Sequence, residues 1–296
     1  MRWLLAAAFT LIVTFAAACS PSAEPANTAQ SQQNNPVVQV TTDPANAGLV
    51  ARVNGIGITQ AAYERSLTRL LTNTTAANRG ALERQVLETL IEQELINQAA
   101  PALGVNITDE NVQAEMTNLR SIATNDAEWQ QYLTLNGYTE EEMVAAQRDL
   151  LVTQGVRDAL MRDYTGSVAQ VNARHIVVRT REEADTILNR LAAGEGFATL
   201  AAEFSIDSTT RETGGNLDWF ARNELFYSNL EEIAFSLENG QIAGPIATSL
   251  GYHIIQTLDK QERPIETGRM PMLSENIFNN WLDSLYRNAS IERYLQ

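Results

Sequence analysis

The chain has 296 residues, of which 44% are hydrophobic and 19% charged, and this composition suggests a folded protein of roughly two domains. Its 36 acidic and 21 basic residues give a formal net charge of -15, which argues against a nucleic-acid partner, because binding to phosphates needs a basic face. One cysteine and two histidines are too few for a CxxC or HExxH zinc site. A phosphate-binding P-loop and a GxSxG nucleophile motif are also absent from the sequence.

The N-terminus has the pattern of a secretory signal. Arg2 precedes an apolar run over residues 3–18, which ends in small residues and is short for a membrane span. The only cysteine, Cys19, follows directly, and the stretch resembles a bacterial lipobox, in which Cys19 would carry lipid. Cleavage at an ordinary Ala-x-Ala site, leaving a free thiol, is the alternative. Residues 1–18 are therefore predicted to be a signal peptide, and residues 19–47 a lipidated cysteine and a flexible tether, since the segment is rich in Ser, Pro, Asn and Gln.

Residues 48–166 are predicted to form a helical domain that begins with a hairpin. Strands are expected at 49–53 and 56–58, joined by the turn dipeptide Asn54-Gly55. Helices are expected over 60–72 and 80–98, from Thr108 onward, and from a capping box at Thr139 to about residue 163. The order VNGxxIT, a long helix and LGVNITDENV resembles the N-terminal region of SurA-type periplasmic chaperones and PrsA-type foldase lipoproteins. A helical domain without that relationship is the alternative.

Residues 168–260 change to a mixed pattern of strands and helices. Strands are expected at 171–178, 217–220, 244–248 and 252–258, and helices at 182–191, 197–204 and 229–237, which predicts a four-stranded sheet. Both histidines, His175 and His253, lie in predicted strands. A single strand histidine is more often a buried core residue than a catalyst. Two of them in one small domain, with Ser205-Ile206-Asp207 after a helix, indicate a polar cluster in apolar surroundings.

Five motifs in this segment resemble those of the parvulin peptidyl-prolyl isomerases in order and spacing. They are ARHIVV, GEGFATLAAEFSID, GGNLDWF, IAFSLENGQIAGPI and GYHIIQTL. The resemblance implies an α+β protein, in which a helical chaperone-like domain accompanies a parvulin domain with a four-stranded antiparallel sheet wrapped by helices. It implies that His175, Asp207 and His253 are the catalytic residues. It implies a substrate site formed by Leu217, Leu225, Leu230, Phe226 and Thr248, with Ser249 near the same turn.

Two departures from the parvulin pattern affect what is expected of the site. Leu230 stands where the family often has a phenylalanine in the proline pocket, and a local shift would let Phe226 take that place. This difference puts catalytic strength in doubt more than the fold. Only Arg179 and Arg181 follow the first strand, so a phosphate-binding cluster and specificity for phosphoserine-proline are not expected.

The residue types suit prolyl isomerisation, which breaks no covalent bond. Its barrier of about 18–20 kcal/mol comes from the partial double bond of the amide, and an enzyme only has to favour the twisted amide over the planar one. An apolar pocket that grips the proline ring and excludes water does this without a metal or cofactor. We expect the histidines and Asp207 to form a hydrogen-bonded network rather than a general base.

The last segment, residues 270–296, is predicted to be a helix from Leu273 to Arg293 with an aromatic face. We expect it to pack on the N-terminal domain, which would make the isomerase an insertion. Packing on the isomerase domain itself is the alternative.

The sequence thus predicts a lipid-anchored isomerase at the outer face of a bacterial membrane. Its partners would be unfolded or partly folded secreted polypeptides with Xaa-Pro bonds, and the membrane through the lipid on Cys19. No nucleic acid and no cofactor are expected, and a homodimer is left open. The alternative function is a non-catalytic chaperone that uses a weak parvulin scaffold to bind clients. A solute-binding lipoprotein is disfavoured, because it would need a larger two-lobed α/β body.

Overall fold

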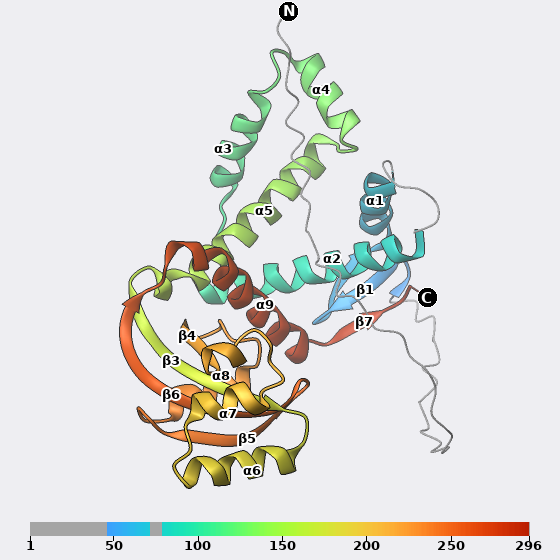
Figure 1. The fold of residues 1–296 in the computed structure, drawn as a ribbon. Coiled ribbons are helices and arrows are strands. Elements are labelled where there is room, and N and C mark those ends of the chain that lie inside the picture. The colour runs from blue at the N-terminus through green and yellow to red at the C-terminus, as the bar shows by residue number, and fades with distance from the viewer. Residues whose placement is uncertain (1–45, 72–78, 296) are drawn as a thin grey trace, which may run out of the picture. The chain divides into compact units, whose positions relative to one another are not determined.

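The computed structural model describes residues 46–71 and 79–295, and their elements are drawn in Figure 1. The predicted signal, Cys19 and nearly all of the predicted tether lie outside the described residues. Within those two ranges, no helix is long and apolar enough to cross a membrane. The mixed α+β fold class predicted from the sequence is confirmed, since the described elements combine a set of helices with a four-stranded antiparallel sheet.

A three-stranded sheet joins the two ends of the described chain. Strands β1 (Leu49–Val53) and β2 (Ile56–Thr59) form the predicted hairpin, and β7 (Ile291–Arg293) pairs with the other edge of β1. The expected helix to residue 293 is wrong at its end, because the helix stops before this strand. The reason is a long-range contact: Asn54 donates its backbone N–H to the Ser290 carbonyl, and its side chain accepts from the Ser290 N–H, both at 2.9 Å.

Six helices of the described ranges accompany this sheet: α1 (Gln60–Leu71), α2 (Arg79–Ala99), α3 (Asp109–Arg120), α4 (Asp126–Leu135), α5 (Glu140–Leu160) and α9 (Met270–Asn288). Thr108 and Thr139 begin α3 and α5, as predicted, and the capping box expected at Thr139 is present. A second capping box, at Thr108, was not predicted. Helix α5 ends at Leu160, a little before the expected residue 163. Helix α4 was not predicted, although its Trp129 is fully buried.

Helix α9 contributes to a core that it shares with α2 and α5. Phe278 and Leu282 of α9 are buried in one cluster with Ile96 of α2 and Val156 of α5. The Arg157 guanidinium of α5 also lies over the Phe278 ring, 3.7 Å from its centre. Trp281, Leu285 and Tyr286 of the predicted aromatic face are partly buried against the same cluster, because removing apolar surface from water is favourable.

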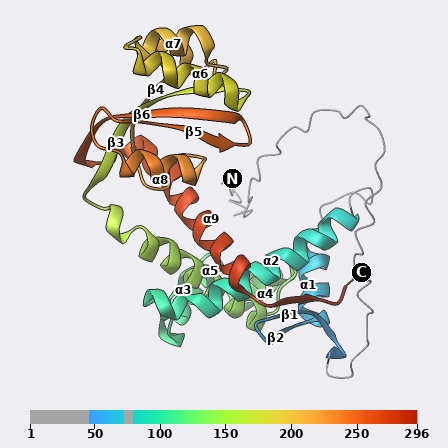
Figure 2. The ribbon, with the colours of Figure 1, turned by 90° about the horizontal axis from the view of Figure 1, so that it is seen from below.

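The second sheet consists of β3 (Ser167–Val178), β4 (Asn216–Ala221), β5 (Ile242–Thr248) and β6 (Gly251–Pro264), paired in the order β4-β3-β6-β5 with every pairing antiparallel. Strands β3 and β6 are longer than predicted. Helices α6 (Arg181–Ala192) and α7 (Phe197–Phe204) cover one face of the sheet, and α8 (Ser228–Ser236) covers the other, as Figure 2 shows.

Both faces of the sheet are covered where the end of β3 pairs with the start of β6, so residues 176–178 and 253–255 are all buried. Ile254 packs under α6 and α7, whereas its neighbour Ile255 packs under α8, and both are fully buried. Directly paired residues of neighbouring strands point to the same face, and His175 pairs with Ile255 while His253 pairs with Val177. The register therefore places both histidines on the α8 face of the sheet.

Candidate active site

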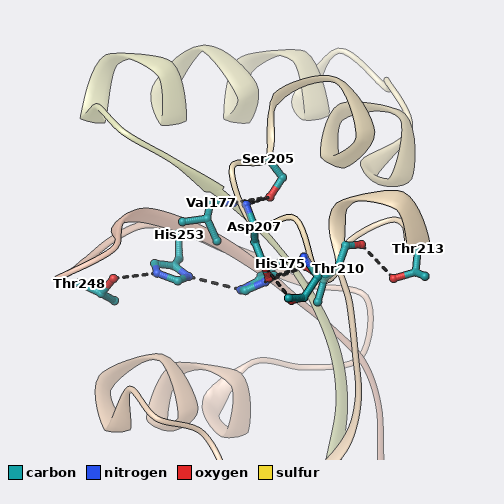
Figure 3. A network of polar contacts seen from close by, with 9 residues as sticks. His175, Val177, Ser205, Asp207, Thr210, Thr213, Thr248 and His253 are labelled. Atoms are coloured by element: carbon teal, nitrogen blue, oxygen red, sulfur yellow. Dashed lines mark hydrogen bonds and ion pairs between the residues drawn. The ribbon is translucent and has the colours of Figure 1, made fainter. Parts of the chain in front are cut away.

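The two histidines meet in the middle of the sheet. His175 of β3 and His253 of β6 are diagonal neighbours whose rings face each other in Figure 3. Their Nδ1 atoms are 3.4 Å apart. His253 is 1% exposed and His175 is 7% exposed, so neither ring is hydrated like a surface side chain. On its far side, His253 Nε2 lies 2.8 Å from the Thr248 hydroxyl at the end of β5. A buried polar pair of this kind requires hydrogen-bond partners, and each histidine has them.

Asp207 is brought to His175 by the segment that follows α7. The Ser205 hydroxyl accepts the Val177 N–H at 3.2 Å, and the Ile206 N–H donates to the Val177 carbonyl at 2.8 Å, which fixes this segment along β3. As a result, an oxygen of the Asp207 carboxylate lies 2.8 Å from His175 Nε2. The polar cluster predicted from the two histidines and this tripeptide is therefore present as a hydrogen-bonded network.

The Asp207 carboxylate is surrounded by further donors. It accepts the Thr209 N–H at 3.0 Å and the hydroxyls of Thr209 and Thr210, both at 2.6 Å. Burial by itself raises the pKa of Asp207, but the hydrogen bonds from the two threonines and from His175 outweigh burial and hold that pKa well below its usual range. The carboxylate is therefore ionised and fully engaged at neutral pH, so it is a poor general base.

Gly215 allows the chain to pass close to His175. The His175 N–H donates to the Gly215 carbonyl at 2.8 Å, and a Cβ at position 215 would lie 2.0 Å from the His175 carbonyl oxygen. Gly215 also has a φ of +81°, which side chains disfavour. The Gly-Gly pair of the GGNLDWF motif is thus needed to hold the loop after Asp207 against β3.

The hydrogen-bond partners fix which ring nitrogens carry protons. Asp207 only accepts, so His175 Nε2–H donates to it, and the Nδ1 of a neutral His175 is an acceptor. His253 Nδ1–H then donates to His175, and its Nε2 accepts from the Thr248 hydroxyl. This assignment gives one chain of donors that runs from Thr248 through both rings to Asp207 and leaves both imidazoles neutral.

Both histidines resist protonation. Burial and, to a smaller extent, the neighbouring His175 lower the pKa of His253 to about 4, against the opposite effect of Asp207. Burial also lowers the pKa of His175, against the opposite effect of its hydrogen bond to Asp207. The rings are therefore neutral near pH 7, and the interior of the site contains a single negative charge that is already matched by donors.

Two family models match the sequence. Residues 2–157, more than half of the chain, match the SurA-like N-terminal domain, and residues 172–259 match the PPIC-type PPIase domain, which contains the histidine network. The chain belongs to the SurA-like and PrsA-type foldases. The second match makes it a peptidyl-prolyl cis-trans isomerase of the parvulin type.

Several curated relatives of this foldase are named foldase protein PrsA. The foldase protein PrsA of Caldanaerobacter subterraneus subsp. tengcongensis is 27% identical over 85% of this chain and 89% of its own. The foldase protein PrsA of Halalkalibacterium halodurans is 29% identical over 60% of this chain and 58% of its own. Among solved structures, the peptidylprolyl isomerase PrsA of Bacillus anthracis is 22% identical over 68% of this chain and 94% of its own, with a TM-score of 0.43. The parvulin of Nitrosopumilus maritimus is 36% identical over 32% of this chain and all of its own, with a TM-score of 0.30.

The predicted substrate residues of the foldase occupy different environments. Leu230 of α8 is 3% exposed and belongs to the core between α8 and the sheet, and Leu217 and Leu225 pack partly buried against the same core. Phe226 is 90% exposed and packs edge-on against Tyr227, with ring centres 5.0 Å apart. The structure thus brings the three leucines together in one apolar cluster and leaves Phe226 at the surface. Their roles as substrate contacts stay predictions.

Two residues at the site were not predicted from the sequence. Thr210 donates to Asp207, and its oxygen lies 3.1 Å from His175 Nε2. Tyr227 places its ring 5.6 Å from the His253 ring, and its hydroxyl is 2.9 Å from the Ser249 hydroxyl. The run SIDSTT, with three hydroxyl residues directly after Asp207, was a usable signal for Thr210. No comparable local signal pointed to Tyr227, because its contacts come from the distant β5–β6 turn.

Acidification is expected to destabilise the foldase between about pH 6.5 and pH 4. The unfolded chain protonates His253 near pH 6.5, whereas the folded chain does so only near 4. Between these values the unfolded state binds more protons, so the free energy of unfolding falls as the pH falls, by roughly 1 kcal/mol per pH unit for one histidine. His175 acts in the same direction. Denaturant titrations at about pH 7, 6 and 5 measure the slope, and a flat profile over this window would contradict neutral, buried histidines.

Proposed function

We propose that the His175–His253–Asp207 network and the apolar cluster beside it form the catalytic site of the isomerase, and that its substrates are Xaa-Pro bonds in partly folded secreted polypeptides. The observation that carries the proposal is the chain of neutral, buried imidazoles, which ends at a carboxylate already satisfied by its own donors. Such a network gives the floor of the site a fixed shape and polarity and offers no group for proton abstraction.

Prolyl isomerisation requires no bond cleavage and no proton transfer from this site. The barrier to prolyl isomerisation lies in the resonance of the planar amide, about 18–20 kcal/mol, and uncatalysed exchange takes tens to hundreds of seconds. A site that holds the proline ring against leucine side chains and keeps water from the planar amide favours the twisted form. In this proposal Leu217 and Leu225 hold the ring, and the histidines keep the polar atoms beneath it in fixed positions.

The test is an isomerisation assay on short Xaa-Pro peptides with the chain that begins after Cys19. We expect the rate of cis-to-trans conversion to rise in proportion to the protein concentration. Peptides with a phosphoserine before proline should gain no advantage over their unphosphorylated forms. Rates equal to the uncatalysed reaction would overturn the proposed site. In that case, suppression of client aggregation by the same sample would favour the chaperone function instead.

We also propose that the foldase is extracytoplasmic and held to a bacterial membrane by lipid on Cys19. The support is the sequence: the only cysteine of the chain ends its only signal-like run. A single short anchor segment of this kind, followed by a polar tether, keeps the folded part near the membrane surface.

Replacing Cys19 by serine is expected to move the protein from the membrane fraction to the soluble extracytoplasmic fraction, because serine cannot form the thioether to lipid. Fractionation and mass spectrometry of the mature N-terminus measure both parts of this prediction. Ser20→Ala is the matched control, since it changes a neighbouring hydroxyl and leaves the thiol in place. Wild-type protein that is wholly soluble outside the cytoplasm would contradict the anchor.

A further inference from the structure

The loop between β4 and α8, residues 222–227, supplies Leu225 and Tyr227 to the site, and it is hydrogen-bonded to helix α9. We propose that Asn223 is a positioning residue through which α9 and Tyr164 hold this loop at the isomerase site, so that substrate affinity depends on α9. The inference rests on the proposed function, since it assigns a purpose to contacts beside that site.

Asn223 joins the loop to elements on both sides of the isomerase segment. Its side-chain NH₂ donates to the Tyr164 hydroxyl at 3.0 Å, and its side-chain oxygen accepts from the Asn280 amide at 3.1 Å. Its backbone carbonyl accepts from the Asn276 amide at 3.0 Å. Asn223 also has a φ of +70°, a conformation that asparagine tolerates better than most residues. Both the side chain and the backbone of this one residue are therefore committed to tertiary contacts.

The neighbouring residues of the loop are held in the same way. The buried Glu231 of α8 accepts the N–H groups of Asn223 and Leu225 at 3.0 and 3.2 Å. Glu224 accepts the Ala221 N–H, and its carboxylate pairs through both oxygens with the Arg269 guanidinium just before α9. A bidentate pair of this type fixes orientation as well as distance.

Apolar packing holds the end of the loop at the site less firmly. Phe226 is 90% exposed, and Leu225 is only partly buried against the α8 core. The position of Leu225 therefore depends strongly on the hydrogen bonds at residues 223 to 225, whereas Tyr227 is also held by its hydroxyl contact with Ser249 and its ring contact with His253. Loss of those bonds should leave the histidine network intact, because the hydrogen bonds that join Thr248, His253, His175 and Asp207 do not involve Asn223 or Glu224.

Helix α9 is suited to transmit this constraint. Asn276 and Asn280 lie one turn apart and face the loop, whereas Phe278 and Leu282 lie on the opposite side of the helix in the core with α2 and α5. A shift of α9 in that core, for example when a client polypeptide binds the SurA-like part of the chain, residues 48–166 together with α9, would move the two amides that hold Asn223. Binding of a client to the SurA-like part would thus change the substrate affinity of the isomerase site through α9 and Asn223.

The test compares the chain that begins after Cys19 with its Asn276→Ala/Asn280→Ala variant. We expect KM for an Xaa-Pro peptide to rise at least about threefold while kcat stays within about twofold, because Leu225 of the loop is loosened and the histidine network is not. Hydrogen exchange of the peptide covering 222–227 should become at least about tenfold faster. Tyr164→Phe removes the hydroxyl that accepts from the Asn223 side chain. It should raise KM and speed the exchange of 222–227 as well, but by less than the double variant.

Asn288→Ala is the matched control, because its amide donates to the Ser284 carbonyl within α9 at 2.8 Å instead of to the loop. It should leave KM and the exchange rate of 222–227 unchanged. Unchanged KM in the double variant, or an equal rise in the control, would overturn the inference while leaving the proposed function standing. A wild type without isomerase activity would overturn the proposed function instead, and the exchange rates would still decide whether α9 holds the loop.

Discussion

Replacing His253 by alanine is expected to lower kcat/KM by at least about tenfold, which corresponds to about 1.4 kcal/mol of transition-state binding. The same change should reduce the free energy of unfolding by about 3 kcal/mol. His253 is 1% exposed, so its removal leaves a cavity next to the Tyr227 ring. It also deprives the buried His175 Nδ1 of its hydrogen-bond partner, and an unsatisfied buried polar atom is costly. Peptide isomerisation and urea unfolding measure the two effects.

The control for this change is Thr257→Ala in the same strand. Thr257 is fully buried, and its hydroxyl donates to the Ala234 carbonyl at 2.8 Å, away from the histidines. It should cost stability and leave the isomerisation rate unchanged at a temperature where both variants are folded by circular dichroism. Full activity in His253→Ala would show that the network does not contribute to catalysis. Equal losses of activity in both variants would mean that the rate reports only on stability.

Replacing Phe278 by alanine is expected to destabilise the SurA-like part by about 3–5 kcal/mol. The ring is 3% exposed, packs in the core with α2 and α5, and lies under the Arg157 guanidinium. We propose that residues 48–166 and 270–296 form one folding unit into which the isomerase domain, residues 168–260, is inserted. The substitution should then lower the thermal transition of that unit, while the sheet formed by β3 to β6 melts as in the wild type.

Met272→Ala is the matched control for the core substitution. This side chain lies on the same helix and is 68% exposed, so its loss should change stability by less than about 0.5 kcal/mol. Calorimetry resolves the transitions, and the near-ultraviolet signal of Trp281 on α9 reports on the SurA-like unit. A drop of the isomerase transition in Phe278→Ala, with the other transition unchanged, would support packing of α9 on the isomerase domain and contradict the insertion.

Some local features were predictable because their causes lie within a few residues. Thr108 and Thr139 begin helices through bonds to the residue three positions later, and Asn54-Gly55 makes its turn through positive φ values. The short strand β7 was missed, because its partners in β1 lie more than 200 residues away in the sequence. Helix α4 was missed although its Asn125 cap is a local signal, since its 10 residues offer few apolar repeats.

The residue types of the site, the isomerase motifs and the order of the strands and helices around them could be predicted from the sequence alone. How these parts meet depends on the tertiary structure. His175 and His253 are joined only because the register of β3 on β6 turns both to the α8 face, and a slip of one residue would turn one ring to the opposite face. The Tyr227 ring on His253 and the Asn223 bonds to α9 likewise depend on elements distant in sequence. Such contacts depend on packing between elements, which motifs and local periodicity do not encode.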